Sequence, residues 1–131
     1  MGVWTNQSEE FSGVLNTSVS TGAGVLLGMN SSGKLVLPVI TSGSSMVPAR
    51  GMAIESGTAG DRITCVRQGK VSGWTGLTRG SIYYNAGGGA ITVTRPSTPG
   101  QLVQAIGWAE TTTTLVLHID DNDNSRKIVS V

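Results

Sequence analysis

The sequence predicts an all-β protein: a small, compact β-barrel or β-sandwich domain with a polar N-terminal arm. Short apolar runs alternate with polar residues, and turns rich in Gly, Pro, Asn and Ser separate the runs at intervals of about 8–12 residues. Helical periodicity is nearly absent. A length of 131 residues favours one domain. We predict an N-terminal arm or first strand at 1–21, a β-domain at 22–120 and a C-terminal tail at 121–131.

Short strands are predicted throughout the first half of the chain. They lie around 13–15 and at 24–29, 34–40, 51–55, 63–67 and 70–74, with turns at 30–33, 56–61 and 68–69 and a loop at 41–50. Pro38 has no N–H to donate, so we expect its strand at a sheet edge or a bulge. A short helix near 41–46 or 98–103 stays open, because neither stretch has a clear pattern.

The final third alternates more regularly. Ile82 and Tyr84 share one face of a strand, as do Ile91 and Val93, and the glycines at 87–89 supply the positive φ angles that a hairpin between them needs. A stiff connection with two prolines follows at 95–100.

Two further strands complete the predicted domain. The first places four residues on one face, and Gly107 interrupts it at a bulge or a close backbone crossing. The second carries a buried stripe. The residues are Leu102, Gln104, Ile106 and Trp108 on the first strand and Leu115, Leu117 and Ile119 on the second.

Charge is scarce. Charged residues make up 13% of the chain and the net charge is +1 without a basic run, so we expect no nucleic-acid partner and no membrane partner. A surface this poor in charge favours coverage by another protein. We see no signal peptide and no membrane-spanning run, and therefore expect synthesis in a cytoplasm. Cys65 is the only cysteine, so it forms no intrachain disulfide and is predicted to be buried.

The motifs that suggest chemistry are all incomplete. Residues 28–35 nearly match a phosphate-binding loop, but Leu35 lacks the required hydroxyl and a strand follows, so we predict a hairpin. The acidic run at 120–123 lacks the glycine and glutamate of a calcium loop. His118 shares a strand face with Asp120, but one His and one Cys make neither a hydrolase triad nor a zinc site. We predict no enzyme, no cofactor and no metal.

The aromatic residues are few, and they are flanked by Gly and Thr rather than by basic residues. Packing in the core or at an interface is therefore favoured over a nucleic-acid platform. A sugar-binding groove built on Trp74 or Trp108 stays open as an alternative.

Several phrases of the sequence resemble those of tailed-bacteriophage capsid decoration (cement) proteins. They are GMAIESGTAGDRITCVRQGKVSG at 51–73, GLTRG at 76–80 with Tyr83 and Tyr84, and PGQ at 99–101 leading to IGWA at 106–109. The likeness covers roughly residues 22–120, and the similar segments correspond to turns and strands rather than to catalytic motifs. Similar phrases occur in phage fibre and tail-associated modules.

The resemblance implies a homotrimer that docks on the outer surface of an assembled phage head, with the major capsid protein as its partner. We expect the arm at 1–21 to reach onto the capsid. The expected capsid or oligomer contacts are Val3, Trp4, Phe11, Trp74, Tyr83 and Trp108. The alternative function is a phage tail-fibre or host-receptor module that binds carbohydrate.

Overall fold

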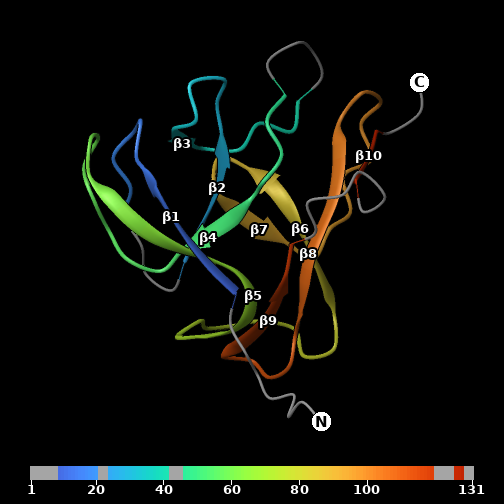
Figure 1. The fold of residues 1–131 in the computed structure, drawn as a ribbon. Coiled ribbons are helices and arrows are strands. Elements are labelled where there is room, and N and C mark those ends of the chain that lie inside the picture. The colour runs from blue at the N-terminus through green and yellow to red at the C-terminus, as the bar shows by residue number, and fades with distance from the viewer. Residues whose placement is uncertain (1–8, 21–23, 42–45, 120–125, 129–131) are drawn as a thin grey trace, which may run out of the picture.

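The chain is all-β, as predicted. The computed structural model describes residues 9–20, 24–41, 46–119 and 126–128, which form one ten-stranded sheet that curls into a barrel-like shape (Figure 1). The strands are β1 (Glu9–Val14), β2 (Val25–Met29), β3 (Leu35–Val36), β4 (Gly51–Ala53), β5 (Arg62–Ser72), β6 (Ile82–Gly87), β7 (Ala90–Thr92), β8 (Leu102–Ala109), β9 (Thr114–His118) and β10 (Arg126–Ile128).

Strand β5 connects the two halves of the sheet. We predicted two strands with a turn at 68–69, and this was wrong: β5 runs without interruption over 11 residues. Gly69 has a φ of 140°, so it bends the strand where the prediction placed a turn. Up to Gln68 β5 pairs with β1, up to Val66 it also pairs with β4, and from Gln68 onwards it pairs with β9.

The pairing partners of β5 show how the sheet divides. Cys65 pairs with both Phe11 of β1 and Ala53 of β4, so these two strands lie on opposite edges of β5. Gln68 likewise pairs with residues of both β1 and β9. Since a strand has only two edges, β4 and β9 follow each other along one edge while β1 occupies the other.

Strands β2, β4 and the first half of β5 form a shared wall between two apolar cores. Neighbouring residues on a strand point to opposite faces, so each core receives alternate residues. The first core contains Leu15, Val19, Leu27, Leu35, Ala53, Ile63 and Cys65. The second core contains Leu26, Met52, Val66 and the inward residues of the other sheet half, among them Tyr83, Ile106, Leu115 and Leu117.

Both cores are closed by contacts between strands that are distant in sequence. Leu15, just after β1, forms a parallel bridge with Leu35 of β3, and Asn16 N donates to the Leu35 carbonyl at 2.8 Å. On the other side, Leu26 N of β2 donates to the Gly89 carbonyl between β6 and β7 at 2.9 Å. The segment after β1 is therefore part of the fold: Leu15 is 1% exposed.

Two predicted hairpins are confirmed. In the 30–33 turn, Gly33 has a φ of 80° and the Asn30 side-chain oxygen accepts from the Ser32 and Lys34 backbone N–H groups. This turn joins β2 to β3, so residues 28–35 form a hairpin rather than a phosphate loop. Between β6 and β7, Gly88 and Gly89 have φ angles of 66° and 93°, as the predicted glycine turn required.

Other boundaries differ from the prediction. The strand expected at 34–40 is only the two-residue β3, which lies at the end of the strand order, an edge position compatible with Pro38. At 98–103 the chain makes a turn, closed by Gln101 N donating to the Thr98 carbonyl, and then enters β8 instead of a helix. Most of 41–46 lies outside the described residues.

Cys65 is buried, as predicted, and lines the first core. Burial, reinforced by the negative charge of Glu55, raises the pKa of its thiol from 9.0 to about 11. At neutral pH the folded protein therefore holds a protonated, enclosed thiol.

We expect the native thiol to react with a soluble disulfide reagent roughly a hundredfold more slowly than the unfolded chain. Because the folded pKa is raised, the contribution of the thiol to stability is complete below pH 9 and is lost as pH rises towards 11. Urea denaturation of the wild type and of Cys65→Ala at several pH values checks this. A stability difference that stays constant across this range would contradict it.

Candidate interaction surface

A bulge in β8 turns Trp108 to the outside of the sheet. Tyr83 pairs with Gly107, but the next residue, Tyr84, pairs with Ala105, so β8 contains one extra residue at Ile106. We predicted that Trp108 shares a face with Leu102, Gln104 and Ile106, and this was wrong. The bulge shifts the alternation by one residue: Ile106 is fully buried, whereas Trp108 is 46% exposed.

Gly107 fits both predictions made for it, a bulge and a close backbone crossing. An alanine Cβ at this position would overlap the carbonyl oxygen of Val116 on β9. The bare glycine thus lets β8 approach β9 closely, and the next pair along these strands is Trp108 with Val116.

The outer face of β9, β8 and β6 carries an apolar row. Trp108 lies directly opposite Val116 on one side and Ile82 on the other. Ile82 is 53% exposed and Val116 is half-buried. Side chains directly opposite each other on neighbouring strands are in contact range, so the three form a continuous surface, which we call the Trp108 row. Lys70 of β5, opposite Val116, ends it.

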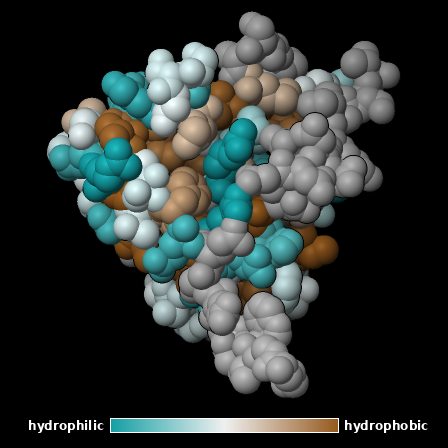
Figure 2. Space-filling view, viewed as in Figure 1, coloured by the Kyte–Doolittle hydropathy of each residue, from teal (hydrophilic) through white to brown (hydrophobic). Residues whose placement is uncertain are grey.

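Figure 2 shows how apolar side chains are distributed over one face of the molecule. Over the described part of that view, brown apolar side chains are interspersed with teal and white ones. Scattered apolar side chains are normal on a soluble protein. The Trp108 row differs from this scattered arrangement because its apolar residues are adjacent and lie on three neighbouring strands.

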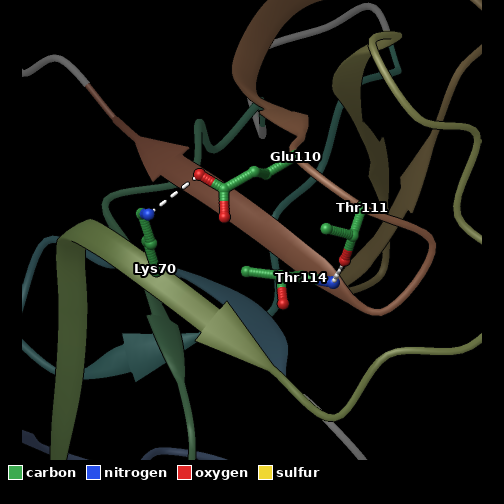
Figure 3. Close-up of polar contacts among 4 residues, drawn as sticks. All are labelled: Lys70, Glu110, Thr111 and Thr114. Atoms are coloured by element: carbon green, nitrogen blue, oxygen red, sulfur yellow. Dashed lines mark hydrogen bonds and ion pairs between the residues drawn. The ribbon is translucent and has the colours of Figure 1, made fainter.

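An ion pair and a threonine turn border the Trp108 row. Lys70 Nζ lies 2.8 Å from Glu110 Oε2, and both side chains are more than 40% exposed (Figure 3). Such a pair contributes at most about 1 kcal/mol to stability. In the turn between β8 and β9, Thr111 Oγ1 accepts from the backbone N–H groups of Thr113 and Thr114 at 3.1 and 3.0 Å. These bonds fix the turn beside the row.

The segment between β5 and β6 holds this turn from the other side. Trp74 N donates to the Thr113 carbonyl, and Leu77 N donates to the Thr112 carbonyl. The Trp74 ring is half-buried against the second core, and its buried Nε1 has no hydrogen-bond partner among the described residues. The Trp74 ring therefore packs against the second core and is less accessible than Trp108.

The other predicted contact residues fall in different places. Tyr83 is 6% exposed and its hydroxyl accepts from Thr78 N at 2.8 Å, so its side chain belongs to the core and is not accessible to a partner. Phe11 on β1 is half-buried against the first core. Val3 and Trp4 lie outside the described residues. The predicted residues thus do not form one cluster.

Sequence reasoning missed Ile82 as a surface residue. The alternation of Ile82, Tyr83 and Tyr84 predicted two faces correctly, but it does not say which face is inside. The burial of Tyr83 and Asn85 places Ile82 and Tyr84 on the outer side. The Tyr83 ring is therefore buried, whereas the smaller, apolar side chain of its neighbour Ile82 is exposed.

A shallow groove lies elsewhere, around the contact between Val19 and Gly57. Its described lining consists of Ser18, Val19, Ser20, Ser56, Gly57, Thr58 and Asp61. Hydrogen bonds from the Thr58 backbone N–H and then its hydroxyl lower the pKa of the Asp61 carboxyl, so this carboxylate is ionised at neutral pH. Its bonds to Thr58 stabilise the turn that leads into β5.

The described part of the chain brings together no three His, Cys, Asp or Glu side chains that could hold a metal ion. His118 is exposed on β9, and the acidic run at 120–123 lies outside the described residues. No helix within the described ranges is long and apolar enough to span a membrane.

Comparison with known proteins gives no further identification. No family model matches the chain, and no curated protein matches it by sequence.

Proposed function

We propose that this chain is a structural protein of a tailed-phage virion, a decoration protein that binds the outer surface of the head and stabilises it. The observation that carries the proposal is the Trp108 row, an exposed apolar surface spread over three neighbouring strands. The resemblance of several segments to capsid decoration proteins adds to it, because one of these segments, 106–109, contains Trp108 itself.

The physical properties of the row suit attachment to another protein. Trp is among the residues most enriched at the energetic hot spots of protein interfaces, whereas exposed ion pairs contribute little. Rigid strands hold the row, so little conformational entropy is lost when it is covered. The major capsid protein is the proposed partner, and self-association into a trimer is part of the same proposal.

The test is co-sedimentation with phage heads that lack their decoration protein. We expect the wild-type protein to sediment with the heads, and the double variant Ile82→Ser, Trp108→Ser to bind at least tenfold more weakly. The matched control is Ile54→Ser: Ile54, just after β4, is similarly exposed at 45%, but it lies outside the Trp108 row. Equal loss in both variants, or wild-type protein that stays in solution, would refute the proposal.

The proposed binding role of the N-terminal arm can be tested by deleting residues 1–8 instead of the whole predicted arm at 1–21. Deleting 1–21 would remove β1 and Leu15, and therefore part of the first core. Deleting 1–8 leaves every described residue in place. We expect this shorter deletion to weaken binding to heads without changing the thermal transition of the free protein, and unchanged binding would remove the arm from the proposal.

A carbohydrate-binding module is the second candidate, because the Trp108 ring is exposed. In that case Trp108→Ser would abolish binding on a glycan array, whereas heads would not retain the wild-type protein.

A further inference from the structure

One edge of β1 has no neighbouring strand in the described part of the chain. Strand β1 pairs with β5 along Glu9–Val14, and it pairs with no other described strand. The opposite edge is used only beyond β1, where Leu15 forms its parallel bridge with Leu35. Along β1 itself this edge is open among the described strands, because the chain before β3 is the turn at 30–33 that joins β3 to β2.

The hydrogen bonds that follow β1 identify the backbone groups on the open edge. Leu15 N donates to the Asp61 carbonyl at 2.8 Å, on the side of β5, whereas Asn16 N donates to the Leu35 carbonyl on the opposite side. Backbone groups of successive residues point to alternate edges of a strand. The even-numbered residues of β1 therefore point their N–H and C=O groups to the open edge; they are Glu10, Ser12 and Val14.

The outer side of the open edge is polar and carries a negative charge. Glu10 and Ser12 are both exposed. Arg62 of β5 donates to Ser12 Oγ at 3.4 Å, so the positive charge nearest to Ser12 is held by a bond within the sheet. Opposite charges directly across from each other stabilise a pair of strands, whereas like charges destabilise it. The edge therefore favours an added strand with a basic residue opposite Glu10.

The inner side of the same strand is apolar. An alanine Cβ at Gly51 would come within 2.6 Å of the Phe11 ring, so this ring lies directly on the Gly51 backbone. Phe11 and Met29, which is 38% exposed, line a pocket of about 110 Å³. Arg50 and Arg67 complete its described lining and already hold interactions within the protein, so only the apolar part is used here. That part has room for one apolar side chain.

We propose that the open edge of β1 binds an extended segment of a partner protein, which adds one strand beside β1. The segment that fits has a basic residue facing Glu10 and, in the next position, an apolar residue that points inward beside Phe11. Main-chain hydrogen bonds along the edge supply affinity in this mode of binding, and alternate side chains supply specificity. The site does not depend on the proposed function, because it involves β1 and not the Trp108 row.

Amide hydrogen exchange of the dilute full-length protein tests whether the edge is open. We expect the amides of Phe11 and Gly13, which face β5, to exchange at least about a hundredfold more slowly than those of Ser12 and Val14. Slow exchange at Ser12 and Val14 would overturn the proposal, because the chain itself would then cover this edge. Protection that rises with protein concentration would assign the edge to a second copy and would overturn it as well.

Binding is tested by NMR with the peptide acetyl-Lys-Val-Thr-Val-Lys-amide, which presents the same pattern in either strand direction. We expect the peptide at millimolar concentration to shift the amide signals of Ser12 and Val14 and to slow their exchange. The matched control, acetyl-Glu-Val-Thr-Val-Glu-amide, should bind at least about threefold more weakly, because its charge is repelled by Glu10. Equal binding of the two peptides, or no shift with either, would overturn the proposal.

Variants of β1 locate the binding at the edge. Ser12→Pro removes an N–H that faces the open edge and keeps the pairing with β5, so binding of the Lys peptide should fall at least about tenfold while the thermal transition stays close to that of the wild type. Ser12→Ala keeps the N–H and should bind as the wild type does. Glu10→Gln gives a second measure that does not depend on the folding of the proline variant: binding should be weaker and less sensitive to salt. Unchanged binding in Ser12→Pro or in Glu10→Gln would overturn the proposal.

Discussion

Replacing Gly107 with alanine should destabilise the protein by at least about 3 kcal/mol, a large part of the total stability of a domain of this size. The new Cβ would overlap the Val116 carbonyl oxygen and lie 3.0 Å from its carbonyl carbon and 3.1 Å from the Leu117 Cα. All three atoms belong to the backbone of β9. They cannot move away without breaking the pairing between β8 and β9.

Urea denaturation of Gly107→Ala measures this effect, and Gly76→Ala is the matched control. Gly76 has a φ of 71° and open space around it, so its alanine variant meets only the backbone strain of about 1–2 kcal/mol. A loss at Gly107 no larger than at Gly76 would show that β8 and β9 separate easily. In that case the Trp108 row, which depends on this close approach, would not be rigid.

The sequence predicted the class of fold because alternation and turn glycines are local properties. The hairpin at 30–33 and the glycine turn between β6 and β7 follow from residues within each turn. The strands at 25–28 and 51–53 were also predictable from short local runs of apolar residues. These runs carry apolar residues on both faces because they form the shared wall, which has a core on each side.

What the sequence could not predict depends on contacts between distant strands. Gly69 looks like a turn glycine, but whether it turns the chain or bends a continuous strand is decided by β1, β4 and β9, which pair with β5. The outward position of Trp108 depends on a bulge that exists only in the register between β8 and β6. A single extra residue moves every later side chain to the other face.

These differences changed the candidate site more than the fold. Trp108 was expected on the face of Gln104 and Ile106, and the bulge places it beside Ile82 on the outer face instead. Tyr83, expected at an interface, fills the core. The function proposed from the sequence resemblance can thus be tested at a specific surface, the Trp108 row. The sequence alone did not predict that the residues of this row lie side by side.

A second large effect is expected from Gln104→Leu, which should cost about 3–5 kcal/mol. Gln104 is 1% exposed and makes three hydrogen bonds: it accepts from Ala49 N and from Asn85 Nδ2, and donates to the Ala49 carbonyl. Leucine would fill the space but leave these buried groups without a partner. Gln101→Leu is the control, since it removes a single exposed bond from Thr98 N and should cost no more than about 1 kcal/mol.

Gln104→Glu separates the hydrogen bonds from the shape of the side chain. The ionised carboxylate can still accept from Ala49 N and Asn85 Nδ2, but it has no proton to donate to the Ala49 carbonyl. Burial should raise the pKa of the new carboxyl above that of the unfolded chain, so the variant should be most stable at low pH and lose stability as pH rises through the folded pKa. Urea denaturation from pH 4 to pH 8, compared with the wild type, measures this. A stability difference independent of pH would show that the hydrogen bond donated to the Ala49 carbonyl contributes little to stability.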